Sequence, residues 1–322
     1  MLLIGCGALG TVIADQLARA GVGRLRICDR DVVEETNLQR QVLFDESDAR
    51  AGTPKAVAAA QRLSRINSSV QLEPHVVDVH SGNIEELIEG RDGAEATSRA
   101  DVILDGSDNA EVRYLINDAA VKQGVPWVYG GCVGTSGRVM AIMPNVSPCL
   151  RCLFPEPPAA GELDTCDTAG VLAPAAAMVA SLQVVMAMKI LLGQPVEQQL
   201  TSFELWSGRI QSISTAGARR DDCPTCGRRD FVFLNRSAAG TTTLCGRDAV
   251  QVLPTTRAAL NAHRIAARLA AAGHTESTQH LVRCSLTESG LGLTVFPDGR
   301  AIIKGTTDPV VARSIYARYV GA

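Results

Sequence analysis

Four cysteines stand in two pairs that have the spacing of metal ligands. Each pair is a C-x-x-C sequence beside a proline, formed by Cys149 with Cys152 and by Cys223 with Cys226. Four thiolates in this arrangement make a closed tetrahedral zinc site, which is structural because no coordination position stays open. The sequence therefore predicts one Zn²⁺ that joins the two segments. The alternative is four buried cysteines without a ligand.

The chain begins with a short apolar run that leads into the glycine-rich loop Gly5–Gly10. A strand that ends in such a loop presents backbone N–H groups to a phosphate at the start of the next helix. Asp29 follows at the spacing at which a carboxylate binds a ribose hydroxyl. These two features predict a bound nucleotide, but they fit a nicotinamide dinucleotide as well as ATP.

Two cations follow Asp29 and bear on which nucleotide is bound. Arg40 ends the sequence TNLQR, and Lys55 ends the sequence GTPK at the start of a predicted helix. A reaction that breaks a triphosphate needs fixed positive charge where negative charge develops, whereas an intact dinucleotide needs few cations. The pattern therefore favours ATP. For Arg40 the alternative is a surface ion pair with Asp45 or Glu46.

A further carboxylate follows the predicted strand Val102–Asp105, in the sequence DGSDN. Ligands of open parallel sheets bind at the carboxyl ends of the strands, so Asp108 is expected beside the nucleotide. A carboxylate there suits Mg²⁺, which bridges phosphate oxygens. The alternative is that Asp108 caps the following helix, and it could do both.

The elements that would position these residues alternate between strand and helix through the first half of the chain. The predicted strands are 25–29, 70–77, 102–105, 125–130 and 138–143, and the predicted helices are 54–66, capped by Thr53, and 110–123. Such alternation predicts an α/β fold with a Rossmann-like, doubly wound, mostly parallel sheet and helices on both faces.

After Pro144 the pattern changes. The expected elements are a mobile loop rich in proline, glycine and acid at 154–165, an apolar helix at 169–193, and hairpin strands at 202–206 and 209–215. A small α+β unit is expected next, with helix 257–272, strands 280–286, 291–296 and 300–304, and a closing helix that begins at Asp308 and Pro309. The sequence thus predicts two domains, 1–235 and 241–322.

Composition fits an ordinary globular protein, since 46% of the 322 residues are hydrophobic and 20% are charged. A net charge of −3 gives no reason to expect nucleic acid as a partner. The longest unbroken apolar run in 169–193 is twelve residues, short of the roughly 18 that span a bilayer, so no membrane is expected. Ten cysteines without an export signal predict a cytoplasmic protein.

In order along about residues 1–235, these motifs resemble the ThiF/MoeB family, the bacterial relatives of ubiquitin-activating enzymes. The resemblance rests on the glycine loop, Asp29, TNLQRQ, GTPK, DGSDN, the paired C-x-x-C sequences, and TCDTAGVLAP at 165–174. It implies an adenylyltransferase. The C-terminal glycine of a small ubiquitin-like sulfur carrier protein, ending in Gly-Gly, would attack the α-phosphate of ATP and release pyrophosphate.

The resemblance also implies roles for individual residues. Gly7, Ala8 and Gly10 would hold phosphate, and Asp29 the ribose. Facing the triphosphate and its Mg²⁺ would be Thr36, Asn37, Leu38, Gln39, Arg40, Lys55, Asp108 and Asn109. Cys166 matches the family's proposed thiol nucleophile, although the neighbouring carboxylates of Asp164 and Asp167 would raise the pKa of its thiol. Family members pair through the region of the apolar helix, so a homodimer is expected.

Some questions stay open at the level of sequence. The resemblance implies a segment before the glycine loop with an arginine that reaches the partner's ATP site, so either the reading frame starts upstream of Met1 or the enzyme lacks this arginine. With no rhodanese module, sulfur would come from a separate donor protein. The alternatives are a non-catalytic scaffold of the same fold and an NAD-dependent oxidoreductase. The motifs do not separate thiazole-type from molybdopterin-type carriers, and the role of 241–322 stays open.

Overall fold

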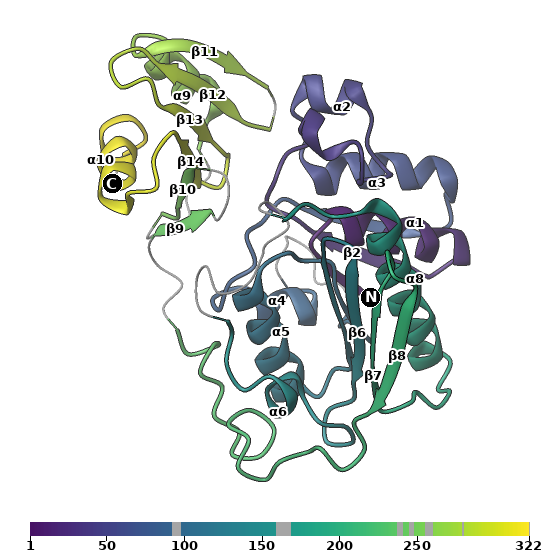
Figure 1. Ribbon diagram of the computed structural model, residues 1–322. Helices are drawn as coiled ribbons and strands as arrows, with labels where there is room; N and C mark the ends of the chain where they lie inside the picture. The colour runs from purple at the N-terminus through teal and green to yellow at the C-terminus, as the bar shows by residue number, and fades with distance from the viewer. Residues whose placement is uncertain are drawn as a thin grey trace. The chain divides into compact units, whose positions relative to one another are not determined.

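The computed structural model describes residues 1–91, 98–158, 169–236, 241–244, 248–254, 260–278 and 280–321. The chain folds into two compact units, Met1–Ser237 and Ala238–Ala322, each with its own hydrophobic core (Figure 1). The loop expected at 154–165 lies partly outside the described residues, and Cys166 lies wholly outside them.

The first unit is built on one eight-stranded sheet with the order β3-β2-β1-β4-β5-β6-β7-β8. Its strands are β1 Leu2–Ile4, β2 Arg24–Cys28, β3 Gln71–His75, β4 Ile103–Asp105, β5 Trp127–Val133, β6 Ser136–Ile142, β7 Gln199–Glu204 and β8 Arg209–Ser214. The five strands from β3 to β5 are parallel, and β6, β7 and β8 continue the sheet in antiparallel pairs. The predicted α/β sheet is therefore confirmed as a mixed one.

Helices cover both faces of this sheet (Figure 1). The longer ones on one face are α1 Ala8–Ala20, α3 Lys55–Ile66 and α8 Ala173–Leu191, and the other face carries α4 Ile84–Glu89, α5 Ala110–Gln123 and α6 Leu150–Leu153. A hydrophobic core lies on each face of this sheet, the first under α1, α3 and α8 and the second under α4, α5 and α6. Side chains alternate along each strand, so in β1 Leu3 lies in the first core while Leu2 and Ile4 lie in the second. This three-layer arrangement buries both faces of the central parallel strands β2, β1, β4 and β5, while the edge strand β3 stays partly exposed.

Helix α8 is long and apolar enough to cross a membrane by length and composition, yet its polar residues are tied into the protein. Gln183 is fully buried, and its Nε2 donates to the carbonyl oxygens of Asp105 at 2.8 Å and Val128 at 3.1 Å. Ser181 accepts a hydrogen bond from Gln16 of α1 at 2.8 Å. These contacts, and its packing against α1, β5 and β6, make α8 a core helix of the unit.

The main differences from the predicted elements are local. The helix expected from Pro54 begins at Lys55, because Pro54 has an extended ψ of 134° and pairs with Val32 in a bridge. Four short segments were missed, the 3-10 turn η1 Glu35–Asn37, helix α2 Glu46–Ala51, and the helices α4 and α6. All four are too short to show a hydrophobic period, and in η1 and α2 hydrogen bonds of the capping side chains define the segment.

The second unit is a six-stranded antiparallel sheet with two helices on one core. Its elements are β9 Thr241–Leu244, β10 Ala249–Val252, α9 Ala262–Leu269, β11 Gly273–Ser277, β12 Val282–Leu286, β13 Gly292–Val295, β14 Ala301–Lys304 and α10 Pro309–Tyr319. The predicted helix is shorter than expected because Asn261 caps it by accepting a hydrogen bond from the backbone of Arg264. Strands β9, β10 and β11 were not predicted, and the largely polar β11 is a strand only because it pairs with β12.

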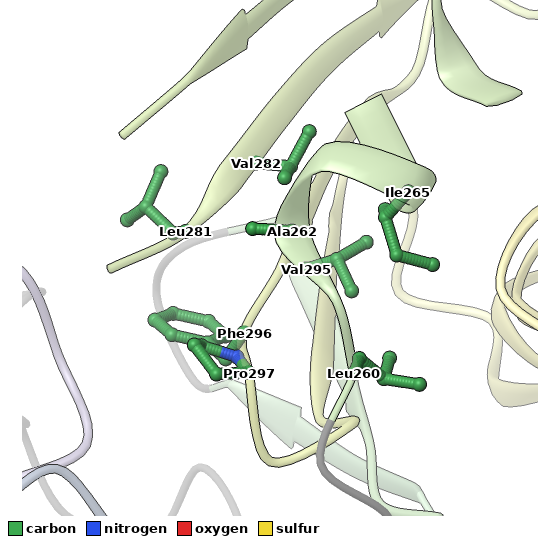
Figure 2. Close-up of a pocket in the computed structure, with 8 residues that line it drawn as sticks. All are labelled: Leu260, Ala262, Ile265, Leu281, Val282, Val295, Phe296 and Pro297. Atoms are coloured by element: carbon green, nitrogen blue, oxygen red, sulfur yellow. The ribbon is translucent and has the colours of Figure 1, made fainter. Parts of the chain in front are cut away.

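Figure 2 shows a small apolar cavity at one end of α9. Side chains of the helix and of the neighbouring strands line it, and its volume is about 10 Å³. That is room for about one water molecule, and the lining offers such a molecule no polar partner. The cavity is therefore a packing defect of the second unit and holds no nucleotide.

Candidate functional site

The order of the strands creates the candidate site. After β1 the chain continues to β2 on one side of β1, and it later returns to β4 on the other side, so the strand order reverses at β1. Ligands bind at such a switch point, beyond the carboxyl ends of the strands. Here the two loops that follow β1 and β4 touch. A Cβ atom built on Gly106 would lie 2.5 Å from the oxygen of Gly5, and one on Gly10 would lie 2.1 Å from the same oxygen. Only glycine allows this contact.

The start of α1 faces this junction as an uncapped helix end. Gly7 is the N-cap, so no side chain of the cap satisfies the first backbone N–H groups of the helix, which begins at Ala8. Such groups, together with the helix dipole, bind anions. The Thr11 side chain donates back to the carbonyl of Gly7 at 2.8 Å, which fixes the turn without occupying these donors.

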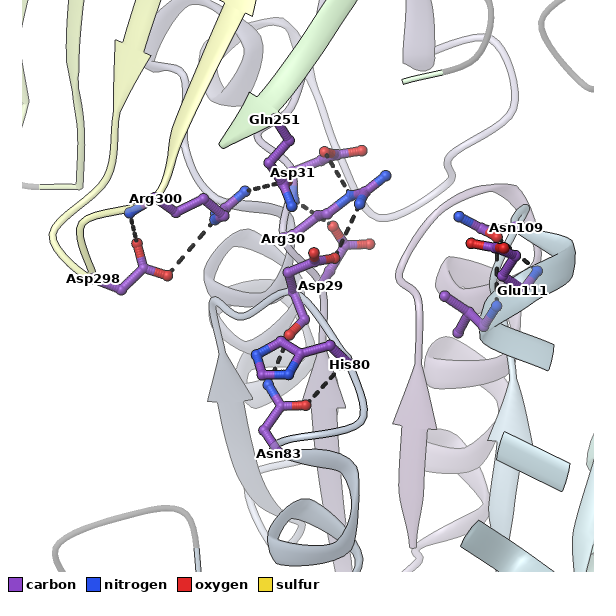
Figure 3. Close-up of polar contacts among 12 residues, drawn as sticks. Asp29, Arg30, Asp31, His80, Asn83, Asn109, Glu111, Gln251, Asp298 and Arg300 are labelled. Atoms are coloured by element: carbon purple, nitrogen blue, oxygen red, sulfur yellow. Dashed lines mark hydrogen bonds and ion pairs between the residues drawn. The ribbon is translucent and has the colours of Figure 1, made fainter. Parts of the chain in front are cut away.

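Asp29 follows β2 and joins the end of this strand to the glycine loop; Figure 3 shows it beside Arg30 and Asp31. Its Oδ2 accepts a hydrogen bond from the backbone of Cys6 at 2.6 Å, and its Oδ1 accepts one from the backbone of Asp31 at 2.7 Å. Burial raises the pKa of the Asp29 carboxyl, and the cation of Lys55 opposes that shift. The predicted ribose ligand thus also holds the glycine loop in place.

Lys55 is 3% exposed and lies at the first position of α3. Its Nζ is 3.4 Å from Oδ2 of Asp31, and its backbone N–H donates to the carbonyl of the same residue at 2.9 Å. The ammonium group is therefore held close to the end of β2, beside Asp29. A buried cation paired with a carboxylate is costly to remove and well placed to meet a second anion.

Arg40 follows η1 and makes one local hydrogen bond, in which its Nη1 donates to the carbonyl of Thr36 at 2.9 Å. In the described part of the chain it forms no ion pair. Both suggested partners are engaged elsewhere, because Asp45 caps α2 and Glu46 pairs with Arg50 at 3.1 Å. The surface ion pair considered for Arg40 is therefore wrong.

The remaining residues of the TNLQR sequence differ in what they contact. Asn37 is buried, and its Oδ1 accepts a hydrogen bond from the backbone of Glu34, which closes the η1 turn. Leu38 packs against the first core, while Thr36 and Gln39 are exposed. The segment thus forms a rigid turn that presents Arg40.

In the loop after β4, the residue that caps the next helix is not the residue expected to bind Mg²⁺. Asn109 is the N-cap of α5, and its Oδ1 accepts hydrogen bonds from Glu111 at 2.8 Å and Val112 at 3.4 Å (Figure 3). The alternative in which Asp108 caps this helix is therefore wrong. Asp108 is exposed, and its carboxylate accepts no hydrogen bond from the described residues.

Three polar side chains near the site were not singled out from the sequence. Arg113 donates to Asp105 at 3.1 Å and to the carbonyl of Ser107 at 2.8 Å, which braces the loop before Asp108. Gln41 is buried, its Oε1 has no partner among the described residues, and its Nε2 lies 3.8 Å from a Cβ built on Gly7. The sequence signal that could have identified Gln41 is its place at the end of the TNLQRQ motif.

Arg30 is the third of these side chains, and it lies between the carboxylates at the ends of the strands (Figure 3). Its Nη1 is 3.0 Å from Oδ1 of Asp78, and its Nε is 3.8 Å from Oδ1 of Asp31. Burial lowers the pKa of Arg30, but neighbouring carboxylates outweigh this and the net shift is upward. Asp78 contributes most of that, and Asp108 also acts on Arg30.

The four predicted metal ligands meet on the other face of the sheet. All four are buried, and their sulfur atoms lie within 4.8 Å of one another. Three of the distances are 3.9 Å for Cys149 to Cys152, 3.6 Å for Cys149 to Cys223, and 3.3 Å for Cys152 to Cys226. Disulfide sulfurs would be about 2.05 Å apart. Thiolates at about 2.3 Å from a tetrahedral zinc are about 3.8 Å apart, so the donor set fits that ion.

The thiols themselves indicate that the cluster needs a cation to ionise fully. Hydrogen-bond contacts with Cys152 and Cys223 raise the pKa of the Cys149 thiol well above its ordinary value. The same kind of contact lowers the pKa of Cys152 to about 6. Four thiolates this close together would repel one another, and a divalent metal that binds them would offset that repulsion.

Comparison with known proteins identifies the family. The ThiF family model matches residues 1–225. The chain is 42% identical to the sulfur carrier protein ThiS adenylyltransferase of Bacillus subtilis, over 99% of this chain and 92% of that protein. It is 36% identical to the SAMP-activating enzyme E1 of Haloferax volcanii, over 70% of this chain and 80% of that protein.

Solved structures agree with this at the level of fold. The crystal structure of Escherichia coli MccB with ATP superposes with a TM-score of 0.59 at 21% identity, over 70% of this chain and 66% of that one. The α/β fold is thus shared with that protein. The chain belongs to the ThiF family, as the motifs indicated.

The glycine junction yields a test of the site's construction. We expect Gly106→Ala to lower the free energy of unfolding by about 2 kcal/mol or more, because its Cβ would meet the oxygen of Gly5 at 2.5 Å. The matched control is Gly7→Ala, where the nearest atom is 3.8 Å away and the expected loss is below about 1 kcal/mol. Fluorescence-monitored urea unfolding suits the measurement, since both tryptophans, Trp127 and Trp206, lie in the first unit. Equal losses would contradict the close contact.

Proposed function

We propose that this protein catalyses ATP-dependent adenylation of the C-terminal glycine of a small ubiquitin-like sulfur carrier protein. One carboxylate oxygen of that glycine would bond to the α-phosphorus while the bond from this phosphorus to the pyrophosphate oxygen breaks. Pyrophosphate leaves with the electron pair, and an acyl-adenylate open to sulfur transfer remains. The full-length identity of 42% to a ThiS adenylyltransferase is the observation that carries the proposal.

The nucleotide would lie across the junction of the two loops. Backbone N–H groups at Gly7, Ala8 and Gly10 would bind phosphate oxygens, since the start of α1 has no capping side chain. Asp29 would accept a ribose hydroxyl with the lone pairs that its two backbone contacts leave. Beside them, Thr36, Leu38, Gln39 and Asn109 would complete the nucleotide surface.

Two cations would stabilise the charge that develops on the triphosphate. Arg40 has donors that form no ion pair among the described residues, so its planar guanidinium can bind phosphate oxygens without losing a carboxylate partner. Lys55, held beside Asp31 at the end of β2, would add positive charge next to the phosphates while keeping its carboxylate partner. Positive charge that is fixed in place before the reaction stabilises mainly the transition state, where negative charge develops.

Asp108 is the residue that would hold a Mg²⁺ ion bound with ATP. Its carboxylate is exposed and accepts no hydrogen bond from the described residues, while Asn109 and Arg113 fix the loop around it. The ion would neutralise phosphate oxygens during the reaction. Cys166, outside the described residues, is kept as the proposed thiol nucleophile.

We propose that the cysteine cluster binds one structural Zn²⁺ through Cys149, Cys152, Cys223 and Cys226. The sulfur distances support this because they match the edge of a tetrahedral thiolate site. The metal would join α6 to the segment after β8 and would take no part in the chemistry.

The proposed partners are a carrier protein ending in Gly-Gly, a separate sulfur donor protein, and a second copy of the chain in a homodimer. The proposed location is the cytoplasm, and neither a membrane nor a nucleic acid is proposed as a partner. The dimer is supported by an apolar surface on the outer side of α8 and just beyond it, formed by Val185, Met188, Leu191 and Leu192. We assign adenylation to the domain 1–235, and leave 241–322 as a small α+β domain without an assigned role.

The first test of this function is the loss of one cation. Arg40→Ala is expected to lower ATP–pyrophosphate exchange with a Gly-Gly-ended carrier by about 100-fold or more, because charge on the triphosphate loses its fixed donor. Its control is Arg50→Ala, a surface arginine of α2 that pairs with Glu46. Exchange in Arg40→Ala equal to that in the control would refute the assignment, and no exchange in the unaltered protein would favour a scaffold.

The second test concerns the metal. Elemental analysis of protein purified without chelator is expected to give one zinc per chain, and Cys226→Ser is expected to abolish it and unfold the first unit. Structural zinc contributes about 10–16 kcal/mol in small peptides, comparable to the stability of a whole domain. Cys284→Ser, at a buried thiol of the second unit, should leave the zinc content unchanged. Absence of zinc from the unaltered protein would rule out the site.

The third test concerns the dimer. Sedimentation at micromolar concentration is expected to give a dimer, and Val185→Glu is expected to give a monomer because it buries an unpaired charge in the interface. Val185 is 54% exposed in the single chain. Val310→Glu, the same change at a 64% exposed position of α10, is the control and should stay dimeric. A monomeric unaltered protein would contradict the proposal.

A further inference from the structure

Two adjacent polar residues, Asn117 and Asp118, are fully buried in the middle of α5, on a helix whose neighbours are apolar. Neither belongs to the nucleotide site or to the cysteine cluster. Burying a carboxylate or an amide is unfavourable unless hydrogen bonds replace the lost water. The partners of these two side chains therefore indicate what the helix is built to hold.

Each residue holds one of the two cysteine pairs. Oδ1 of Asn117 accepts a hydrogen bond at 2.9 Å from the backbone of Leu150, which lies inside the first C-x-x-C sequence. Oδ1 of Asp118 accepts one at 2.6 Å from the hydroxyl of Thr225, which lies inside the second. The other carboxylate oxygen of Asp118 accepts the backbone N–H of Phe233 at 2.9 Å. The two pairs, far apart in sequence, are thus fastened to consecutive residues of one helix.

The same helix is fastened to the candidate nucleotide loop at its other end. Asn109 caps it, and in its first turn Arg113 donates to Asp105 and to the carbonyl of Ser107. Asn117 follows Asn109 by eight residues, which is about 12 Å along a helix that rises 1.5 Å per residue. A rigid element of this length connects the cysteine cluster on one face of the sheet with the loop that carries Asp108.

We propose that Asp118 is a positioning residue that fastens the second cysteine pair to α5, and that the metal-bound cluster thereby fixes the loop bearing Asp108. The inference rests on the proposed metal site and the proposed adenylation. The cysteine pair, Thr225, Asp118 and the start of α5 form one connected series of protein contacts, to which a bound metal would be joined. Loosening the contact between Thr225 and Asp118 should therefore act at both ends, on metal retention and on the affinity for ATP.

The test uses Thr225→Val in the full chain, because valine keeps the shape of threonine and removes the hydroxyl donor. Release of zinc to a chromophoric chelator should be at least about 10-fold faster, the usual effect of losing a group that orients a metal ligand. In ATP–pyrophosphate exchange the KM for ATP should rise several-fold while kcat changes less than about twofold, since the reacting groups remain. The absorption spectrum of the cobalt-substituted protein should shift as the ligand geometry relaxes.

Two further variants serve as controls. Thr201→Val makes the same change at a buried threonine of β7, whose hydroxyl bonds Ser212 at 3.1 Å, and should leave release and KM unchanged. Thr225→Ser keeps the hydroxyl and should release zinc as the unaltered protein does, even if Thr225→Val folds poorly.

The outcomes separate the inference from the proposals beneath it. Equal zinc release in Thr225→Val and Thr201→Val, or fast release in Thr225→Ser, would overturn the role of Asp118. Faster release with an unchanged KM for ATP would overturn the link to the nucleotide loop. An unaltered protein without zinc would overturn the metal site itself, and one with zinc but no exchange would overturn the adenylation.

Discussion

The contact between two backbones, at Gly5 and Gly106, is the constraint on which the rest of the site depends. It brings the loop after β1 against the loop after β4, and with Gly10 it leaves no room for any side chain at the junction. Because both loops lie at the carboxyl ends of parallel strands, the uncapped start of α1 and the carboxylate of Asp108 come to one edge of the sheet. A phosphate and a cation can then be bound together there.

Charge around this junction is arranged before any ligand arrives. Lys55 and Arg30 are paired with carboxylates at the strand ends, and Asp29 is occupied by two backbone donors. Arg40 and Asp108 differ, since neither has an oppositely charged partner within hydrogen-bond reach among the described residues. Groups that are already paired hold the geometry, and the two that are not are the ones with bonding capacity left for a nucleotide and its metal.

On each face of the sheet, buried polar side chains tie a long helix to neighbouring backbone or loop segments. On one face Gln183 of α8 donates to the carbonyls of Asp105, the last residue of β4, and of Val128 in β5, and on the other Asp118 of α5 holds the second cysteine pair. Both groups are surrounded by apolar side chains, where a hydrogen bond is strong and its loss is costly. Gln183 therefore fixes α8 against β4 and β5, and Asp118 fixes α5 against the segment that carries the second cysteine pair.

Local sequence was enough to predict the glycine loop, the cysteine pairs, helix 110–123 and the α/β class, because each depends on residue spacing or hydrophobic period. It also indicated the family, since these motifs keep their order along the chain. It could not separate Asp108 from Asn109 as the helix cap, nor exclude an ion pair for Arg40, because both depend on side-chain partners. Arg30, Arg113 and Asp118 were missed because tertiary structure alone, by bringing distant strands and loops together, gives these residues their partners.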